Sequence, residues 1–272
     1  MKSYMKTGLR AALQQPFAVI ALFLYQMGWG ALLYKLVQSV LVPLMHRFPG
    51  GGQPKQAMQL FLAEGQFQLL KTDLSHSYLW WLAALLGARM LLTPMLNAGV
   101  YYSLTHRHQN AGYRFFKGIK ELTLPFLITY FVRMVLSLLP LLWLLPKVQT
   151  IYAHTTSYEE AALQMLPWLL GLLSYGFLLN LLFMYVQFAI AARIGIISTF
   201  ITFIRYSLPI LGLALLILLI SGLLTGITVT ATYIWAGLVA LLIYQLYPLF
   251  NMFLQMWAIT SQYQLWTAKM NK

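Results

Sequence analysis

Long, uninterrupted apolar stretches dominate the chain and predict its elements. About 20 apolar residues are needed for a helix to cross the hydrocarbon core of a bilayer. Six stretches reach that length: 17–42, 78–104, 122–145, 163–192, 208–230 and 233–257. Their apolar residues are continuous rather than alternating, which favours helices over the strands of a membrane barrel. The pattern predicts an all-α integral membrane protein with one domain over residues 1–272, a bundle of six transmembrane helices.

The composition agrees with a membrane environment. Apolar residues make up 60% of the chain and charged residues only 8%, against about 25% charged residues in an ordinary soluble domain. So few charges would not cover the surface of a soluble domain of this size, whereas a bilayer accepts an apolar exterior. The chain has no cysteine, which excludes disulfides, thiolate metal sites and cysteine catalysis.

Lysine and arginine are distributed unevenly between the predicted loops, and this bias sets the orientation. The inner segments hold Lys2, Lys6, Arg10, Arg107, Arg114, Lys117, Lys120, Arg193, Arg205, Lys269 and Lys272, and the outer loops hold Arg47, Lys55, Lys71 and Lys147. Both termini are therefore predicted to be cytoplasmic, in the cell membrane if the source is bacterial. The net charge of +13 suits anionic lipids on the cytoplasmic side better than nucleic acid, because the basic residues lie in short runs between spans.

Basic, amphipathic segments precede three of the predicted inner helix starts, and each is followed by a proline. The pairs are 8–10 with Pro16, 118–120 with Pro125, and 203–205 with Pro209. Proline suits the first turn of a helix, where its missing N–H has no partner to lose. The pattern suggests three copies of one helix-pair unit, although basic residues and proline also occur at such positions by chance.

Two amphipathic segments are predicted to lie at the membrane surfaces. Arg114, Lys117 and Lys120 recur at three-residue intervals and are predicted to contact the inner leaflet. We predict that this segment is an amphipathic helix along the inner interface, with its aromatic side chains inserted in the leaflet. The alternative is that it extends the third span, since Pro125 is compatible with both. Residues 56–71 of the longest outer loop gather their apolar side chains on one face. This second segment lies on the outer leaflet or packs on the ends of the bundle.

The layout of the chain is similar to that of a known group. Proline-led helices and amphipathic inner segments such as Tyr113–Lys120 resemble the broad group of bacterial six-helix membrane proteins that includes the membrane domain of glycerophosphodiester phosphodiesterases. The resemblance extends over nearly the whole chain but includes no catalytic motif. Because the phosphodiesterase chemistry of that group resides in a separate soluble domain, the resemblance implies a fold and carries over no catalytic residue.

Residues that could perform catalysis are sparse. The chain has no H-E-x-x-H, Walker or G-x-S-x-G motif, and we predict no catalytic, cofactor-binding or metal-ligating residues. Glu159 and Glu160 are adjacent and would point about 100° apart on a helix, which does not make an acid–base pair. His106 and His108 have no nearby carboxylate in the sequence, which is typical of a basic loop rather than a metal site.

Arg89 and Arg133 are the charges that lie deepest in the predicted spans. A charge at the bilayer centre costs about 2.5–3.5 kcal/mol on insertion scales, so such residues normally face protein or a wet cavity. The second and third spans are expected to pack antiparallel, which would bring both guanidiniums to one cavity. The candidate polar site is Arg89, Arg133, Asn97, Asn180 and Gln187. It would bind an anion such as a phosphate-bearing headgroup, or only form hydrogen bonds between helices.

Small residues in the fifth predicted span allow close helix packing. Ser221, Gly222, Thr225 and Gly226 form overlapping pairs separated by three residues. Such pairs let helix backbones approach closely in a membrane. We expect them to pack within the chain rather than to form a dimer.

Two functional hypotheses follow from these observations. The first is a non-enzymatic accessory, assembly or regulatory membrane component, which would act with membrane lipids and with a membrane-protein partner. The alternative is a transporter or permease subunit for an anionic or amphipathic solute, which Arg89 and Arg133 favour. A membrane enzyme acting on lipids ranks behind both, because catalytic groups are so few.

The predicted orientation can be tested directly, because the chain has no native cysteine. A cysteine at Gln53 should react with an impermeant thiol reagent added to intact cells, whereas one at Gln109 should react only after permeabilisation. Reversed labelling would contradict the orientation. Equal labelling at both positions would contradict the number of spans.

Overall fold

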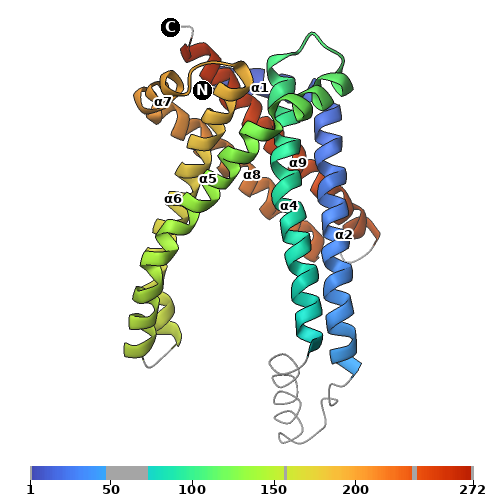
Figure 1. The fold of residues 1–272 in the computed structure, drawn as a ribbon, viewed down its shortest axis with the longest axis vertical. Coiled ribbons are helices and arrows are strands. Elements are labelled where there is room, and N and C mark those ends of the chain that lie inside the picture. Colours follow the sequence, from blue (N-terminus) through green and yellow to red (C-terminus); the bar gives the residue numbers. More distant parts are fainter. Residues whose placement is uncertain (1, 47–72, 156–157, 235–237, 271–272) are drawn as a thin grey trace, which may run out of the picture. The chain divides into compact units, whose positions relative to one another are not determined.

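The computed structural model describes residues 2–46, 73–155, 158–234 and 238–270. These residues form eight α-helices and no strand (Figure 1). The helices are α1 (Lys2–Leu13), α2 (Pro16–His46), α4 (Asp73–Thr105), α5 (Ala111–His154), α6 (Tyr158–Ala192), α7 (Ile196–Arg205), α8 (Ser207–Ile234) and α9 (Leu238–Met270). The predicted all-α class is therefore confirmed for the described residues.

Among the described residues, five helices are long and apolar enough to cross a membrane. Their spanning segments are Pro16–Ser39, Tyr78–Thr105, Ala111–Ile151, Glu159–Ala192 and Ser207–Thr232, which correspond to the first five predicted spans. The sixth predicted span, 233–257, includes residues 235–237, which lie outside the described residues. The predicted amphipathic segment 56–71 also lies outside them. The count of six spans and the position of that segment therefore stay predictions.

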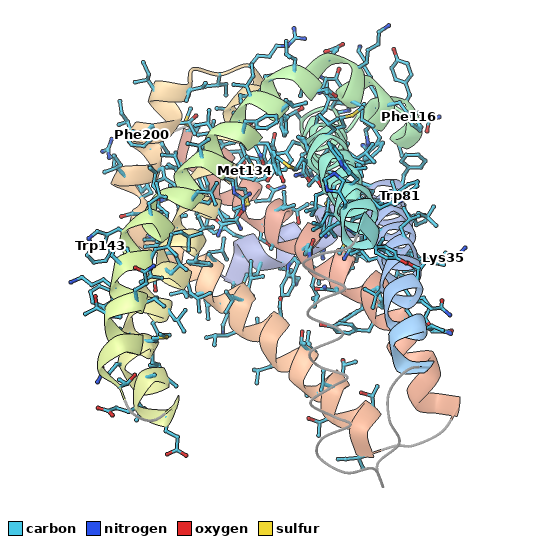
Figure 2. The ribbon with its side chains drawn as sticks, turned by 60° about the horizontal axis from the view of Figure 1, so that its bottom comes forward. Lys35, Trp81, Phe116, Met134, Trp143 and Phe200 are labelled. Carbon is cyan, nitrogen blue, oxygen red and sulfur yellow. The ribbon has the colours of Figure 1, made fainter. Side chains whose placement is uncertain are left out.

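The outward-facing side chains of these helices are largely apolar. Figure 2 shows Trp143 of α5 and Trp81 of α4 among them, and their exposed fractions are 57% and 64%. Soluble monomers rarely expose apolar surface on this scale. The exposed side chains therefore agree with a helical protein surrounded by lipid.

The chain divides into two compact units. The smaller unit is Ala21–Thr93, and the larger unit combines Met1–Ile20 with Pro94–Lys272. In the smaller unit α2 and α4 are joined by a hydrogen bond between the hydroxyls of Tyr25 and Thr93, 3.0 Å apart. The Tyr78 hydroxyl also donates to the Ser39 carbonyl at 3.4 Å. Two hydrogen bonds thus connect α2 with α4 within this unit.

An aromatic cluster forms the core of the larger unit. Phe188 of α6 is 1% exposed, and its ring lies 5.2–5.8 Å from four other rings, those of Tyr101, Tyr185, Tyr263 and Trp266. Phe126 of α5 joins the cluster through Tyr101, with ring centroids 5.5 Å apart. Because such ring pairs contribute about 0.5–1.5 kcal/mol each beyond their burial, the cluster holds α4, α5, α6 and α9 together.

The N-terminal helix α1 packs on α9 through its smallest residues. Gly8, Ala11 and Ala12 form its buried face. The Gly8 carbonyl accepts a hydrogen bond from the Thr260 hydroxyl at 2.8 Å. A Cβ atom at Gly8 would lie 2.6 Å from the Cα atom of Ser261. The absence of a side chain at Gly8 is therefore what allows the two backbones to approach this closely.

The three predicted amphipathic segments fold in two different ways. The first and third are separate helices, α1 and α7, each followed by a short break before the next helix. The second is continuous with the third span, because α5 begins at Ala111 and passes through Pro125 without interruption. Figure 1 shows the first turns of α5 crossing the top of the view before the helix descends. The segment around Arg114 is therefore an extension of the span rather than a separate interfacial helix.

Substitution of Gly8 tests the close approach of α1 and α9. We expect Gly8→Ala to destabilise the protein by about 1–3 kcal/mol, as overpacking does. The matched control is Gly176→Ala in α6, where a Cβ atom would meet no atom within 4 Å. The control should be neutral or stabilising by up to about 1 kcal/mol, because alanine is the better helix former. Thermal unfolding in detergent measures the stability of both variants. Equal changes in stability for Gly8→Ala and Gly176→Ala would contradict the close packing of α1 on α9.

Candidate functional site

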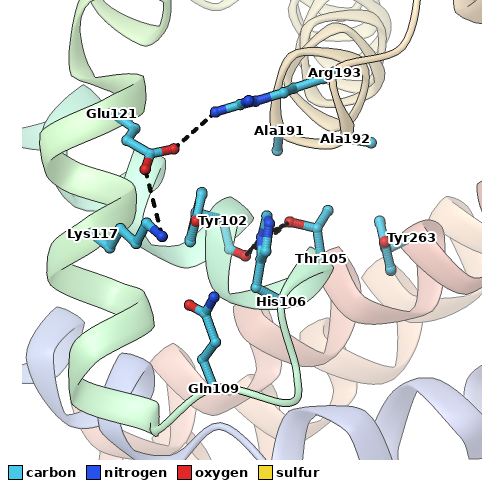
Figure 3. Close-up of a pocket in the computed structure, with 10 residues that line it drawn as sticks. All are labelled: Tyr102, Thr105, His106, Gln109, Lys117, Glu121, Ala191, Ala192, Arg193 and Tyr263. Carbon is cyan, nitrogen blue, oxygen red and sulfur yellow. Dashed lines mark hydrogen bonds and ion pairs between the residues drawn. The ribbon is translucent and has the colours of Figure 1, made fainter.

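A polar pocket lies where four helices of the larger unit come together at one end (Figure 3). Its volume is about 640 Å³. It is lined by Tyr102, Thr105, His106, Gln109, Lys117, Glu121, Ala191, Ala192, Arg193 and Tyr263. These residues come from the end of α4, the loop after it, the first turns of α5, the end of α6, and α9. In a chain with 8% charged residues, three charged side chains in one pocket are a notable concentration.

In the part of the chain that the structure describes, Glu121 is the only carboxylate that lines this pocket, and it faces two cations. Its Oε2 atom lies 3.0 Å from Arg193 Nη2 and its Oε1 atom lies 3.8 Å from Lys117 Nζ. Lys117 is one turn earlier on α5, whereas Arg193 reaches across from the end of α6, as Figure 3 shows. The carboxylate therefore joins α5 to α6 and leaves the three groups with one net positive charge.

Arg193 occupies a backbone conformation that usually requires glycine. Its φ is 56°, in the left-handed region that costs an ordinary residue about 1–2 kcal/mol. The Arg193 N–H donates to the Ile190 carbonyl at 3.2 Å, and the Ile194 N–H donates to the Ala189 carbonyl at 2.9 Å. These two bonds form a Schellman motif, which ends α6 at Ala192. A strained residue that also carries a pocket cation marks the end of α6 as a candidate functional position.

The end of α4 supplies a flat aromatic wall. The rings of Tyr102 and His106 are stacked, with centroids 4.0 Å apart and planes at 9°. The Nδ1 atom of His106 lies 2.8 Å from the Thr105 hydroxyl oxygen, which holds the ring in place. In the loop that follows, the Gln109 side-chain oxygen is buried without a hydrogen-bond partner. A glutamine side chain carries an NH2 group with two donors beside its oxygen, and rotating the amide by 180° exchanges the two groups. The amide of Gln109 can therefore present donors to a ligand.

Tyr263 connects the pocket with the aromatic core. Its ring lies 5.4 Å from that of Phe188. Burial raises the pKa of the Tyr263 hydroxyl, while the charge of Arg107 acts in the opposite direction. Because an ordinary phenol is already protonated at neutral pH, Tyr263 is a neutral hydrogen-bond donor in the pocket wall.

The basic residues predicted to contact the inner leaflet have three different environments. Arg114 is 6% exposed and donates to the carbonyls of Arg107 at 3.2 Å and Gln14 at 3.3 Å. Lys117 belongs to the pocket, and Lys120 is exposed. Arg114 therefore holds the start of α5 against two chain segments. Of the three side chains, Lys120 is the one free to reach a lipid surface.

The predicted intramembrane site is distributed over both units. Arg89 belongs to the smaller unit, where its guanidinium lies 5.6 Å from the centre of the Trp29 ring in a cation–π contact. Arg133 belongs to the larger unit, where it is half-buried. Of the polar residues, Gln187 is buried, Asn97 half-buried and Asn180 exposed. A cavity shared by both arginines stays a prediction, and none of these five residues lines the pocket.

The small residues of α8 have two environments. Thr225 Oγ1 accepts a hydrogen bond from the Tyr247 hydroxyl of α9 at 2.9 Å, and Thr225 donates to the Ser221 carbonyl at 2.8 Å. Gly222 and Gly226 are exposed, and a Cβ atom at either would meet no atom within 4 Å. Thr225 therefore contributes to packing within the chain, while the two glycines face outward.

Comparisons with protein families, with characterised proteins and with solved structures found no match to this chain. The resemblance in layout to the membrane domain of glycerophosphodiester phosphodiesterases therefore stays an expectation. Among the described residues, no group of three or more histidine, aspartate or glutamate side chains gathers where it could hold a metal ion.

The strain at Arg193 can be measured by comparing two substitutions. Arg193→Gly and Arg193→Ala both remove the guanidinium. The difference between their stabilities therefore isolates the effect of the backbone conformation at this position. We expect the glycine variant to be more stable by about 1 kcal/mol, because only glycine adopts the left-handed conformation without strain. Lys120 lies inside α5, so there the order should be reversed. Lys120→Ala should be more stable than Lys120→Gly by about 1 kcal/mol. The same order at both positions in thermal unfolding would contradict the strained turn.

Proposed function

We propose that the protein is a non-enzymatic membrane component that binds a phosphate-bearing anion in this pocket. The observation that carries the proposal is the arrangement of Lys117 and Arg193 around one carboxylate. Glu121 occupies the place between the cations that an anionic ligand would take. Arginine binds phosphate oxygens through two parallel hydrogen bonds, and lysine adds a compact charge. The hydroxyl of Tyr263 and the amide of Gln109 add uncharged donors around the same space.

The contacts of Glu121 favour binding over catalysis. A catalytic base normally faces a hydroxyl, thiol or water whose proton it removes. In the described pocket Glu121 instead forms ion pairs with two cations. His106 is likewise held by its stack on Tyr102 and by the Thr105 hydroxyl. These groups are therefore placed to stabilise charge rather than to transfer a proton.

The gathering of basic residues at one end of the larger unit supports the predicted orientation. Arg205 and Lys269 both contact the Tyr206 ring, at 5.6 Å and 4.7 Å from its centre. Figure 1 shows α1, the last turns of α9 and α7 at the same end. Because basic residues accumulate on the cytoplasmic side of membrane proteins, we assign this end to the cytoplasm. There the pocket would meet inner-leaflet headgroups and soluble phosphates.

The contact between the pocket and the core favours a binding site over a transport pathway. Tyr263 lines the pocket and also packs on Phe188, which is buried. The pocket therefore ends on a tightly packed aromatic cluster on that side. A transporter would need these rings to separate during each cycle, so we rank the permease hypothesis second.

Anion binding predicts specific changes in thermal stability. In an uncharged detergent, inorganic phosphate or short-chain phosphatidylglycerol should raise the unfolding temperature. Arg193→Gln should weaken this binding about tenfold or more, since a hydrogen bond to a charged group contributes about 1.5 kcal/mol or more. Glu121→Gln should strengthen it, because the internal competitor for both cations is removed.

Lys147→Gln is the matched control for Arg193→Gln, because each substitution removes one positive charge. Lys147 is exposed on α5, about 39 Å from Glu121 along the helix at about 1.5 Å per residue, and its substitution should leave binding unchanged. A response to the lipid alone would identify a headgroup as the ligand, and a response to phosphate alone would identify a soluble anion. No response to either, or equal responses in all three variants, would refute the proposal.

A further inference from the structure

Helix α7 turns its apolar face away from the protein. Ile197, Ile201 and Ile204 have exposed fractions of 78%, 59% and 59%, whereas Thr199 is 1% exposed. The exposed apolar residues form one helical stripe: Ile196, Ile197, Phe200, Ile201 and Ile204. Figure 2 shows Phe200 on the outer side of the molecule. A surface helix of a soluble protein would have the opposite arrangement.

The contacts of α7 fix this orientation. The Thr202 hydroxyl donates to the Ser198 carbonyl at 2.9 Å and also lies 3.2 Å from the sulfur atom of Met270 in α9. Phe203 points inward, with its ring 5.3 Å from that of Tyr185 in α6. At the other end, the strained turn at Arg193 and the N-cap residue Gly195 join α7 directly to α6. Rotating the isoleucines inward would therefore break contacts with two helices.

The position of α7 in the chain places it at the boundary of the bilayer. It connects the spanning segments Glu159–Ala192 and Ser207–Thr232. Its 10 residues extend only about 15 Å at 1.5 Å per residue, about half the hydrocarbon thickness of a bilayer. The helix is too short to cross, yet its outer face is as apolar as that of a spanning helix. Such a helix is accommodated in the plane of the interface, with its apolar side toward the acyl chains.

Basic residues stand at both ends of α7. Arg193 precedes it, and Arg205 ends it beside Lys269. Each basic side chain near an anionic leaflet contributes about 1 kcal/mol of attraction. The apolar stripe and the flanking charges therefore match the hydrocarbon and the headgroups of one leaflet.

We propose that α7 is an in-plane membrane anchor whose exposed isoleucines insert into the phospholipid leaflet at the basic end of the protein. The occupant of this face is bilayer lipid rather than another protein. The anchor would hold the end of α6, and with it Arg193, at the level of the headgroups. The anchor would form whichever anion the pocket binds.

Accessibility of spin labels tests this anchor. Single cysteines at Ile197, Ile201 and Ser198 are introduced into the full chain, which has no native cysteine. All three positions are exposed, so the fold should tolerate them, and thermal unfolding checks that it does. The labelled proteins are reconstituted in phosphatidylcholine vesicles containing phosphatidylglycerol. Collision rates are then measured with oxygen, which concentrates in hydrocarbon, and with a water-soluble nickel chelate.

We expect the ratio of oxygen to nickel collisions to be several-fold higher at Ile197 and Ile201 than at Ser198. Equal ratios at the three positions, with frequent nickel collisions, would show that the isoleucines face water and would overturn the proposal. Protection of Ile197 and Ile201 from both reagents would also overturn it, because the face would then be covered by protein, such as a second copy of the chain.

Discussion

The packing of helices around Phe188 is the interaction on which the larger unit depends. In lipid there is no hydrophobic driving force between helices, so they associate through close van der Waals packing and interhelical hydrogen bonds. Phe188 supplies such packing to α4 and α9 at once. The same helices then place the pocket: Tyr101 joins the cluster while the neighbouring Tyr102 lines the pocket, and Tyr263 does both. Without this core, the groups around Glu121 would have no fixed positions.

Charged residues are scarce in this chain, and three of them lie together in the pocket beside the aromatic core. Glu121 uses its carboxylate to hold α5 and α6 together through Lys117 and Arg193. The strained backbone at Arg193 ends α6, starts the turn to α7 and directs a cation to the pocket. A ligand that competed with Glu121 for Arg193 would therefore act at the joint between a spanning helix and the in-plane helix. This placement would let a membrane component sense anionic groups at the bilayer surface.

The sequence predicts the helices well, because a bilayer imposes long continuous apolar runs that are visible without any tertiary information. The boundaries are less well predicted. Pro125 suggested a helix start, but α5 continues through it, since the loss of one N–H is tolerated inside a long apolar helix. The break before α7 has a local signal in Gly195, although the strained residue is its neighbour Arg193.

The pocket was missed because it depends on residues far apart in the chain. Lys117 and Glu121 form an i,i+4 pair that the sequence displays, but Arg193 lies 72 positions after Glu121. The sequence pattern instead singles out the arginines inside the spans, of which Arg89 contacts Trp29. Arg114 was expected at the lipid surface, yet it is buried, because carbonyls of Arg107 and Gln14 accept its hydrogen bonds. Such contacts follow from tertiary structure and have no counterpart in a local pattern.

The most direct test of the central claim is an experimental structure of the protein in lipid nanodiscs that contain phosphatidylglycerol. If the pocket binds phosphate-bearing anions, density for a phosphate group should lie between Lys117 and Arg193, with the Arg193 guanidinium turned from Glu121 toward it. A pocket that contains only water while both ion pairs of Glu121 remain intact would contradict the account.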